Sequence, residues 1–186
     1  MDQKKFDFIK EKYGLHASWA IWANEGGTPK SNMGDLSIFD NNKILLKLNP
    51  NIVLVGLNFS VSGVVQKTFQ NFHGSGGGAY KIRYALKDTP LWGAYMTDII
   101  KDFPEKKSNN VISYLKKNKS LVDENIVKFE EELRDIGANN PTIIGFGNGS
   151  FELLKNNIGS KYNIIKAMHY SHYISKEKYR EHINHV

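Results

Sequence analysis

Four short apolar segments recur along the chain, and stretches with helical spacing lie between them. The first, 51–58 (NIVLVGLN), has four consecutive aliphatic residues from Ile52 to Val55, and the others are 92–100, 141–146 and 162–168. Short apolar runs without alternation are typical of strands that are covered on both faces. Because strands that alternate with helices form parallel sheets with helices on both faces, we expect an α/β fold.

Seven segments are expected to form helices. The clearest is 121–136, in which Ser120 and Asp123 form a capping-box pair and Gly137 ends the helix. The others are 3–13, a short helix at 42–49 capped near Asn42, 79–89, 111–118, 151–157 and 175–183. No repeat, low-complexity tract or linker divides the chain. We therefore expect a single domain over residues 1–186, with residues 1–43 packed on it as an N-terminal helical and loop extension.

The composition narrows the classes of function. The chain has no cysteine, which excludes disulfides, thiolate catalysis, zinc–thiolate sites and cysteine-bound iron–sulfur clusters. No apolar stretch approaches the roughly 18 residues that span a bilayer. The N-terminal segment lacks the apolar core of a signal peptide, so we expect a cytoplasmic protein. The formal net charge of +6 fits a polyanionic partner such as nucleic acid, although lysine-rich chains are often basic without one.

Polar residues stand where each expected strand ends. They are Asn58, Thr97 with Asp98, the turn 145–150, and His169 with Ser171. Because the carboxyl ends of parallel strands converge, an amide, an acid and an imidazole should line one crevice. A plainer interpretation of Asn58 is that Gly-x-Asn is a common exit from a strand. His169 and His172 have a spacing that suits a metal on a helix, but no third ligand is evident, so we expect no metal site.

Four segments together resemble the uracil-DNA glycosylase superfamily. GLNFS at 56–60 resembles its first motif, Gly-x-Asn-Pro or Gly-x-Asp-Pro, and HYSHY at 169–173 resembles its second motif, His-Pro-Ser. The segment 94–100 lies where many members have a strand ending in Thr-Asn, and 141–154 is similar to the third strand and its turn into a helix. The resemblance runs in order over residues 44–180 and implies a three-layer α/β/α fold with a four-stranded parallel sheet.

The chain departs from the family's pattern at three positions. Phe59 and Tyr170 replace the two motif prolines, and Asp98 replaces the asparagine whose amide reads the base. The lack of cysteine implies a branch without an iron–sulfur cluster, or a divergent one. An ionised aspartate offers only acceptors and repels O4 of uracil, so it suits a base with an amino group, such as cytosine, adenine or guanine. Alternatively, Asp98 faces away and pairs with a lysine.

The resemblance implies a DNA glycosylase that hydrolyses the N-glycosidic bond of a flipped, damaged or deaminated base. In the catalytic roles, Asn58 positions the attacking water and His169 donates a hydrogen bond to O2 of the base. The base stacks on Phe72, or on Phe69 as second choice, unless both are core residues. The expected base-binding residues are Gly56, Phe59, Phe72 and Asp98, and the expected DNA-binding residues are Ser60, Ser171, Gly76 and Tyr173, the last as a wedge.

These roles imply DNA, single- or double-stranded, as the partner of a monomeric protein, with no membrane contact, no metal and no organic cofactor. Two other classes of function stay open. A catalytically silent member of the superfamily would bind nucleic acid or a nucleobase in the same crevice. A nucleotide-binding α/β protein would hold a phosphate with GFGNGS at 145–150, but that turn lacks the Lys-Ser/Thr ending of a P-loop.

Overall fold

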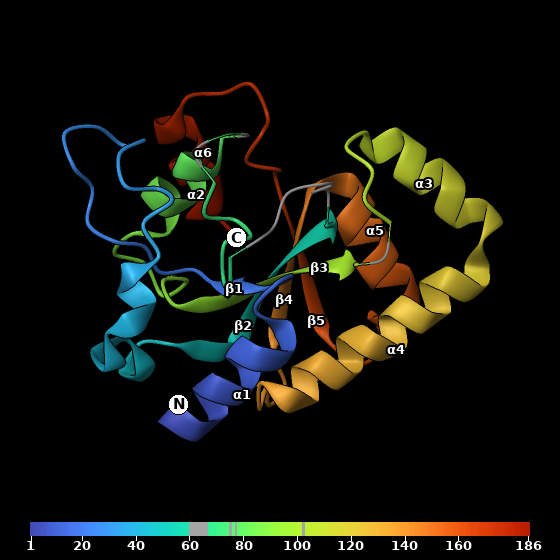
Figure 1. Cartoon of the computed structure of the whole chain (residues 1–186). Helices are drawn as coiled ribbons and strands as arrows, with labels where there is room; N and C mark the ends of the chain where they lie inside the picture. The colour runs from blue at the N-terminus through green and yellow to red at the C-terminus, as the bar shows by residue number, and fades with distance from the viewer. Residues whose placement is uncertain (60–66, 75, 77, 102) are drawn as a thin grey trace.

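A five-stranded, mostly parallel sheet forms the centre of the computed structural model, which describes residues 1–59, 67–74, 76, 78–101 and 103–186. Its strands are β1 (Ser18–Trp19), β2 (Asn49–Asn58), β3 (Ala94–Ile100), β4 (Thr142–Phe146) and β5 (Asn163–Ala167). They lie in the order β1-β3-β2-β4-β5, and β2 to β5 run parallel (Figure 1). The α/β class and the parallel pairing expected from the sequence are confirmed.

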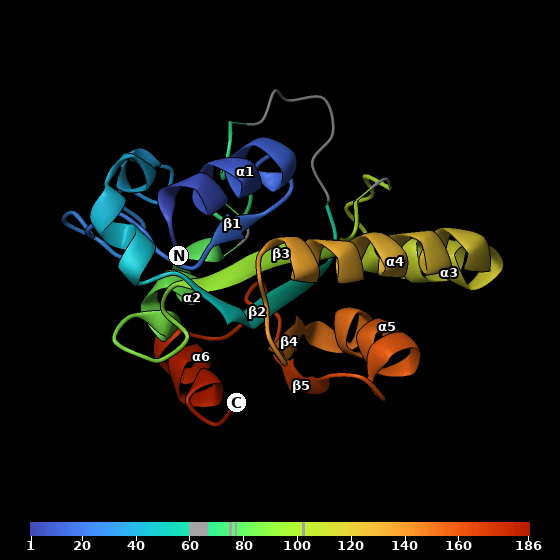
Figure 2. The same ribbon diagram turned by 90° about the horizontal axis from the view of Figure 1, so that it is seen from below.

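Helices cover both faces of the sheet, as Figures 1 and 2 show. On one face lie α1 (Gln3–Tyr13), α4 (Lys119–Asp135) and α5 (Gly147–Ile158), with α3 (Ser108–Lys117) packed beside α4. On the other face, α2 (Ala79–Leu86) and α6 (Lys176–Ile183) pack against each other. Two short 3-10 helices, Ser37–Asp40 and Asn42–Leu46, precede β2, and Asn41 rather than Asn42 caps the second.

Side chains that alternate along the strands divide the core between the two faces. Val53, Val55 and Tyr95 pack with α1 and α4, whereas Leu54 and Met96 pack with α2 and α6. All five are almost fully buried, which explains why their segments show no alternation of polar and apolar residues. Consecutive residues at a strand end therefore face different helices.

The strand that the sequence did not predict is β1, which comes from the N-terminal region. Ser18 and Trp19 pair antiparallel with Met96 and Tyr95 of β3. Trp19 is completely buried, with its ring centroid 4.9 Å from that of Tyr95. Two residues are too few to show a periodicity. In the described residues the sheet thus has five strands rather than the four expected, and the N-terminal region supplies one of them.

Several expected boundaries are wrong: α3, for example, begins at Ser108 rather than at residue 111, and two further cases have a clear cause. α4 begins at Lys119, directly after Asn118, so Ser120 lies inside the helix and no side chain caps its start. The reason is that α3 ends at Lys117, which leaves a single residue between the helices. β3 continues to Ile100 instead of ending near Thr97 and Asp98, because all seven of its residues are buried in the sheet.

None of the helices in the described part of the chain combines the length and the apolar character that a membrane crossing needs.

Candidate functional site

A cleft of about 490 Å³ opens at the carboxyl ends of the parallel strands. Six of the residues expected at a site line it: Gly56, Asn58, Phe72, Asp98, His169 and Ser171. Further walls come from the region around the start of α3, at Lys106, Ser108, Asn109 and Ile112, and from the first turn of α5. Asn58 ends β2 and His169 follows β5. Because the carboxyl ends of parallel strands converge, the segments 56–60 and 169–173 both reach the cleft.

The side chain of Asn58 ties the end of β2 to the connection between β3 and α3. Its Nδ2 donates to the backbone carbonyl of Phe103 at 3.0 Å and to that of Glu105 at 2.8 Å. These two bonds use both amide hydrogens and set the orientation of the amide. The oxygen Oδ1 is therefore the group that Asn58 can offer to a ligand in the cleft, and it is an acceptor.

Asp98 lies opposite Gly56 in the paired strands β3 and β2. A Cβ on Gly56 would collide with Oδ1 of Asp98, so the glycine leaves the space that the carboxyl group fills. The other oxygen, Oδ2, accepts a hydrogen bond from Nδ2 of Asn71 at 2.9 Å. Asp98 therefore faces the cleft and is held by an amide.

Burial raises the pKa of Asp98 to about 6, although the hydrogen bond from Asn71 and the charge of Lys101 lower it. Asn71 is itself fixed, because its Nδ2 also donates to the carbonyl of His16 at 2.6 Å. Both amide hydrogens of Asn71 are thus used, so this amide offers no donor to a ligand. Asn71 was not predicted from the sequence, where its position beside Phe72 is the one signal that marks it.

Phe72 and Phe69 have different surroundings, although both have a positive φ (68° and 62°). Phe72 is buried in the core on the α2 and α6 face and also lines the cleft, and its ring comes within 3.8 Å of the position that a Cβ on Gly56 would take. Phe69 packs in the core between Phe6 and Phe39, at centroid distances of 5.5 and 4.9 Å. A bulky residue with positive φ is strained by about 1 kcal/mol or more, so the loop around Phe72 is held by its contacts.

The geometry around His169 sets the tautomer of its ring. Nδ1 accepts a hydrogen bond from the backbone N–H of Ser171 at 3.1 Å and lies 2.8 Å from its hydroxyl. A nitrogen that accepts carries no proton, so the proton of the neutral ring is on Nε2. Burial lowers the pKa of His169, which favours this neutral form. The ring stacks on Tyr170 at 4.3 Å, so the residue in the place of the motif proline supports the imidazole.

The first turn of α5 forms the floor of the cleft. Residues 147–150, expected as a turn, are already helical, and Gly147 has a φ of 79° that turns the chain out of β4. No side chain caps this helix start. Ser150 instead donates from Oγ to the carbonyl of Val55 at 2.8 Å, which fixes α5 on β2.

Thr97 does not reach the cleft. It points to the opposite face of β3, where its hydroxyl and that of Tyr95 donate to Oε1 of Glu132 at 2.9 and 2.6 Å. Lys101 Nζ forms an ion pair with Oε2 at 2.7 Å and also donates to the carbonyl of Asp98 at 2.8 Å. Glu132 is fully buried within the apolar stripe of α4. An acid in that stripe was the sequence signal for this network, and it was missed.

The remaining predicted residues lie outside the cleft or outside the described residues. Phe59 packs edge-on against His16 at 5.0 Å. Tyr173 is fully exposed at 101%, as a wedge would be, and Gly76 is exposed with open space around it. Ser60 lies outside the described residues.

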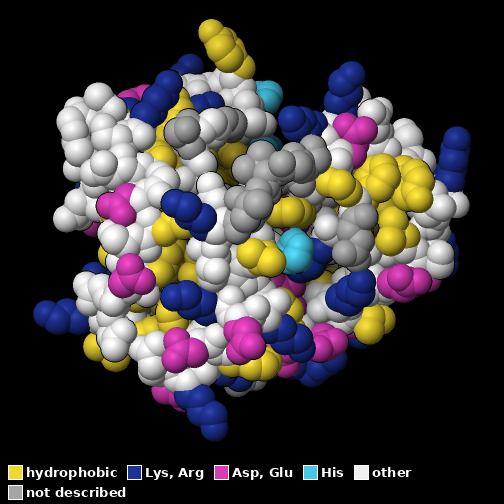
Figure 3. Space-filling view, viewed as in Figure 1, with side chains coloured by type: hydrophobic (Ala, Val, Ile, Leu, Met, Phe, Trp, Pro, Cys, Tyr) yellow, Lys and Arg dark blue, Asp and Glu magenta, His cyan; other side chains and the backbone are white. Residues whose placement is uncertain are grey.

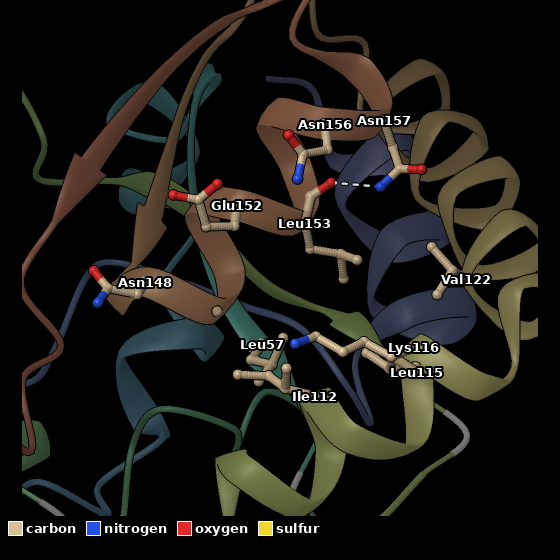
Figure 4. Close-up of a pocket in the computed structure, with 11 residues that line it drawn as sticks. Leu57, Ile112, Leu115, Lys116, Val122, Asn148, Glu152, Leu153, Asn156 and Asn157 are labelled. Atoms are coloured by element: carbon tan, nitrogen blue, oxygen red, sulfur yellow. Dashed lines mark hydrogen bonds between the residues drawn. The ribbon is translucent and has the colours of Figure 1, made fainter.

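A second cavity, of about 370 Å³, lies between α3 and α5 and shares four lining residues with the cleft: Leu57, Ile112, Asn148 and Gly149. Figure 4 shows its mainly aliphatic wall, with an acid, Glu152, and several amides at the side of α5. The amide of Asn157 is bonded to its own helix, at the carbonyl of Leu153. No histidine lines this cavity in the described residues, so of the two spaces the larger cleft is the one that combines an acid with an imidazole.

Positive charge is not concentrated around the cleft. Lys106 is the cationic side chain among the described residues that line it. On the face of the molecule that Figure 3 shows, Lys and Arg side chains are dispersed, with Asp and Glu side chains between them. In the described residues, no group of three or more His, Asp or Glu side chains is placed to hold a metal ion.

Comparisons of the chain with protein-family models, with curated proteins and with solved structures find no match.

Proposed function

We propose that the cleft binds a nucleotide flipped out of DNA and hydrolyses its N-glycosidic bond, as an enzyme similar to the uracil-DNA glycosylases. The observation that carries this proposal is that Asn58 and His169, which belong to two distant motifs, line one cleft with Phe72 and Asp98. Helices on both faces of a mainly parallel sheet support the three-layer fold that the motifs imply.

Each of these side chains has a chemical role in the proposed reaction. Bond cleavage puts positive charge on the sugar and negative charge on the departing base, and Nε2–H of His169 donates to a carbonyl oxygen of that base. Asn58 accepts a hydrogen bond from the attacking water through Oδ1. Because an amide cannot take the proton, Asn58 orients the water without acting as a general base, and the proton that the water loses ends on the departing base. Phe72 stacks on the base, which contributes roughly 1–3 kcal/mol.

The dispersed charge bears on how DNA is held. Each phosphate neutralised by a cation contributes a slope of about −0.7 to −0.9 to the dependence of log affinity on log salt. With Lys106 as the cation at the cleft, we expect a shallow salt dependence and an affinity that depends strongly on the flipped base.

A silent binding protein is the second candidate, and a specific observation favours it. Both amide hydrogens of Asn58 are used within the protein, and Asp98 stands where an asparagine reads the base in the resembled family. Such a cleft would still bind a base through Phe72 and Asp98 without releasing it.

A panel of oligonucleotides, each with a single natural or modified base, separates the two candidates. The panel is incubated with the protein and assayed for abasic sites, and binding is measured on the same set. We expect base release from at least one oligonucleotide, with the loss of that release in Asn58→Ala. Binding without release from any oligonucleotide would instead establish the silent protein.

A further inference from the structure

Around Asp98, the cleft offers a base hydrogen-bond acceptors rather than donors. The side-chain amides of Asn71 and Asn58 already donate both of their N–H groups to oxygens of the protein. Asp98 keeps Oδ1 beside Gly56 and the second lone pair of Oδ2. The segment 169–173 supplies the donor Nε2–H of His169, and its Tyr170 and Ser171, which carry hydroxyl groups, line the cleft as well.

From this arrangement we infer that the cleft selects a base with two adjacent N–H donors followed by a carbonyl, the edge of guanine and of guanine altered on its five-membered ring. The carboxylate of Asp98 accepts from N1–H and from the exocyclic amino group, while His169 donates to O6. This inference rests on the proposed function, since it names the base that the same cleft takes.

The other bases match this edge less well. Cytosine and adenine place a ring-nitrogen lone pair beside their amino group, and that lone pair faces an acceptor of Asp98. Uracil places the oxygen O4 beside N3–H, with the same repulsion. Hypoxanthine keeps N1–H and O6 of guanine but lacks the amino group, so it tests the second donor alone.

Asp98 must be ionised to accept both hydrogen bonds from guanine. The groups around Asp98 set its pKa and therefore the pH range in which it is ionised. Burial raises the pKa of Asp98 to about 6 and the charge of Glu132 from α4 raises it too, whereas Asn71 and Lys101 lower it. Tyr170 packs near enough that the Asp98 charge helps to raise the pKa of its phenol, and His169 and Lys106 line the same cleft. The carboxyl group is thus ionised at neutral pH and becomes protonated in mild acid.

The test compares single-stranded oligonucleotides that differ only in one central base: guanine, hypoxanthine, adenine, cytosine or uracil. Affinities are measured by fluorescence anisotropy at pH 7.5 and pH 5.0. We expect guanine to bind best at pH 7.5, ahead of adenine and hypoxanthine by roughly tenfold, which is the effect of one hydrogen bond to a charged group. At pH 5.0 this advantage should shrink, because the loss of a carboxylate acceptor approaches tenfold per pH unit below the pKa.

Two variants complete the experiment. Asp98→Asn replaces one acceptor with a donor, so the preference should move from guanine to uracil. Asp123→Asn makes the same change of charge at an exposed position on α4 and should keep the preference for guanine.

Each outcome separates this inference from the proposed function. A preference for uracil or cytosine at pH 7.5, or equal binding of all five bases, overturns the guanine assignment, even if base release that needs Asn58 is found. A preference for guanine without base release supports the assignment and leaves the cleft as a binding site.

Discussion

The carboxyl group of Asp98 fills the space that a side chain on Gly56 would need, because the two residues pair across strands β3 and β2. Gly56 is thus required by a contact at the cleft as well as by the exit from the strand. The contact shows that Gly56 does more than end the strand, and a ligand site at the Gly-x-Asn sequence stays a prediction.

Gly56→Ala is therefore expected to disturb both stability and the cleft. The added methyl group overlaps Oδ1 of Asp98, and overpacking of this kind costs about 1–3 kcal/mol. The free energy of unfolding, from urea titration, measures the loss. Gly27→Ala is the matched control, since a Cβ there meets nothing within 4 Å and stability should be unchanged. Equal stability of the Gly56→Ala variant and the unmodified protein would contradict the close contact.

The pH dependence of stability tests the burial of Asp98. Its pKa is raised in the folded state to about 6, so folding favours the protonated carboxyl group. The stabilisation is present below the ordinary pKa near 4 and is lost as the pH rises through 6. Asp98→Asn removes this loss, so its stability relative to the unmodified protein should rise by on the order of 2–3 kcal/mol between pH 4 and pH 7. A difference that stays constant with pH would show that Asp98 is not buried.

Phe72 and Phe69 are expected to respond differently to truncation. Phe69→Ala empties a site in the core between Phe6 and Phe39 and should cost about 3–5 kcal/mol of stability. Phe72→Ala should also lower stability, because Phe72 is buried in the core on the α2 and α6 face, but it should in addition weaken the binding of oligonucleotides by roughly 1–3 kcal/mol through lost stacking. Stability is measured by denaturation and affinity by anisotropy. If Phe72→Ala left the affinity unchanged, Phe72 would be a packing residue alone.

Glu132 provides a test of the network beneath the cleft. Glu132→Gln removes the partner of Lys101, and breaking a buried ion pair costs about 3–5 kcal/mol. Glu131→Gln, one residue earlier on the exposed surface, breaks only the pair with Lys12 and should leave stability nearly unchanged. Equal denaturation midpoints for the two variants would contradict a structural role for Glu132.

The sequence predicted the parts of the fold that depend on long patterns. The four parallel strands, their alternation with helices and the meeting of Asn58 with His169 all follow from apolar runs and from where they end. The apolar stripe of α4 likewise predicted its buried face.

The rest depends on contacts that leave little trace in sequence. Every residue of β3 is buried, so nothing shows that Thr97 turns to Glu132 while Asp98 turns to the cleft. The two-residue strand β1 is held by the pairing of Trp19 with Tyr95 rather than by a pattern of its own. Asn71 bonds Asp98 across 27 positions of sequence, a contact that no local pattern marks.

In the proposed reaction, Asn58 accelerates cleavage of the N-glycosidic bond and contributes little to the affinity for DNA. Asn58→Ala should lower the single-turnover rate of base release by a factor of about 100 or more, the effect of roughly 3 kcal/mol in the transition state, with little change in DNA affinity. Asn110→Ala is the control, because Asn110 bonds Glu105 in the same connection from outside the cleft and should keep the rate. The decisive measurement is this rate on the oligonucleotide that the protein processes best. A large drop for Asn58→Ala alone is expected, and equal rates for both variants and the unmodified protein would contradict catalysis by Asn58.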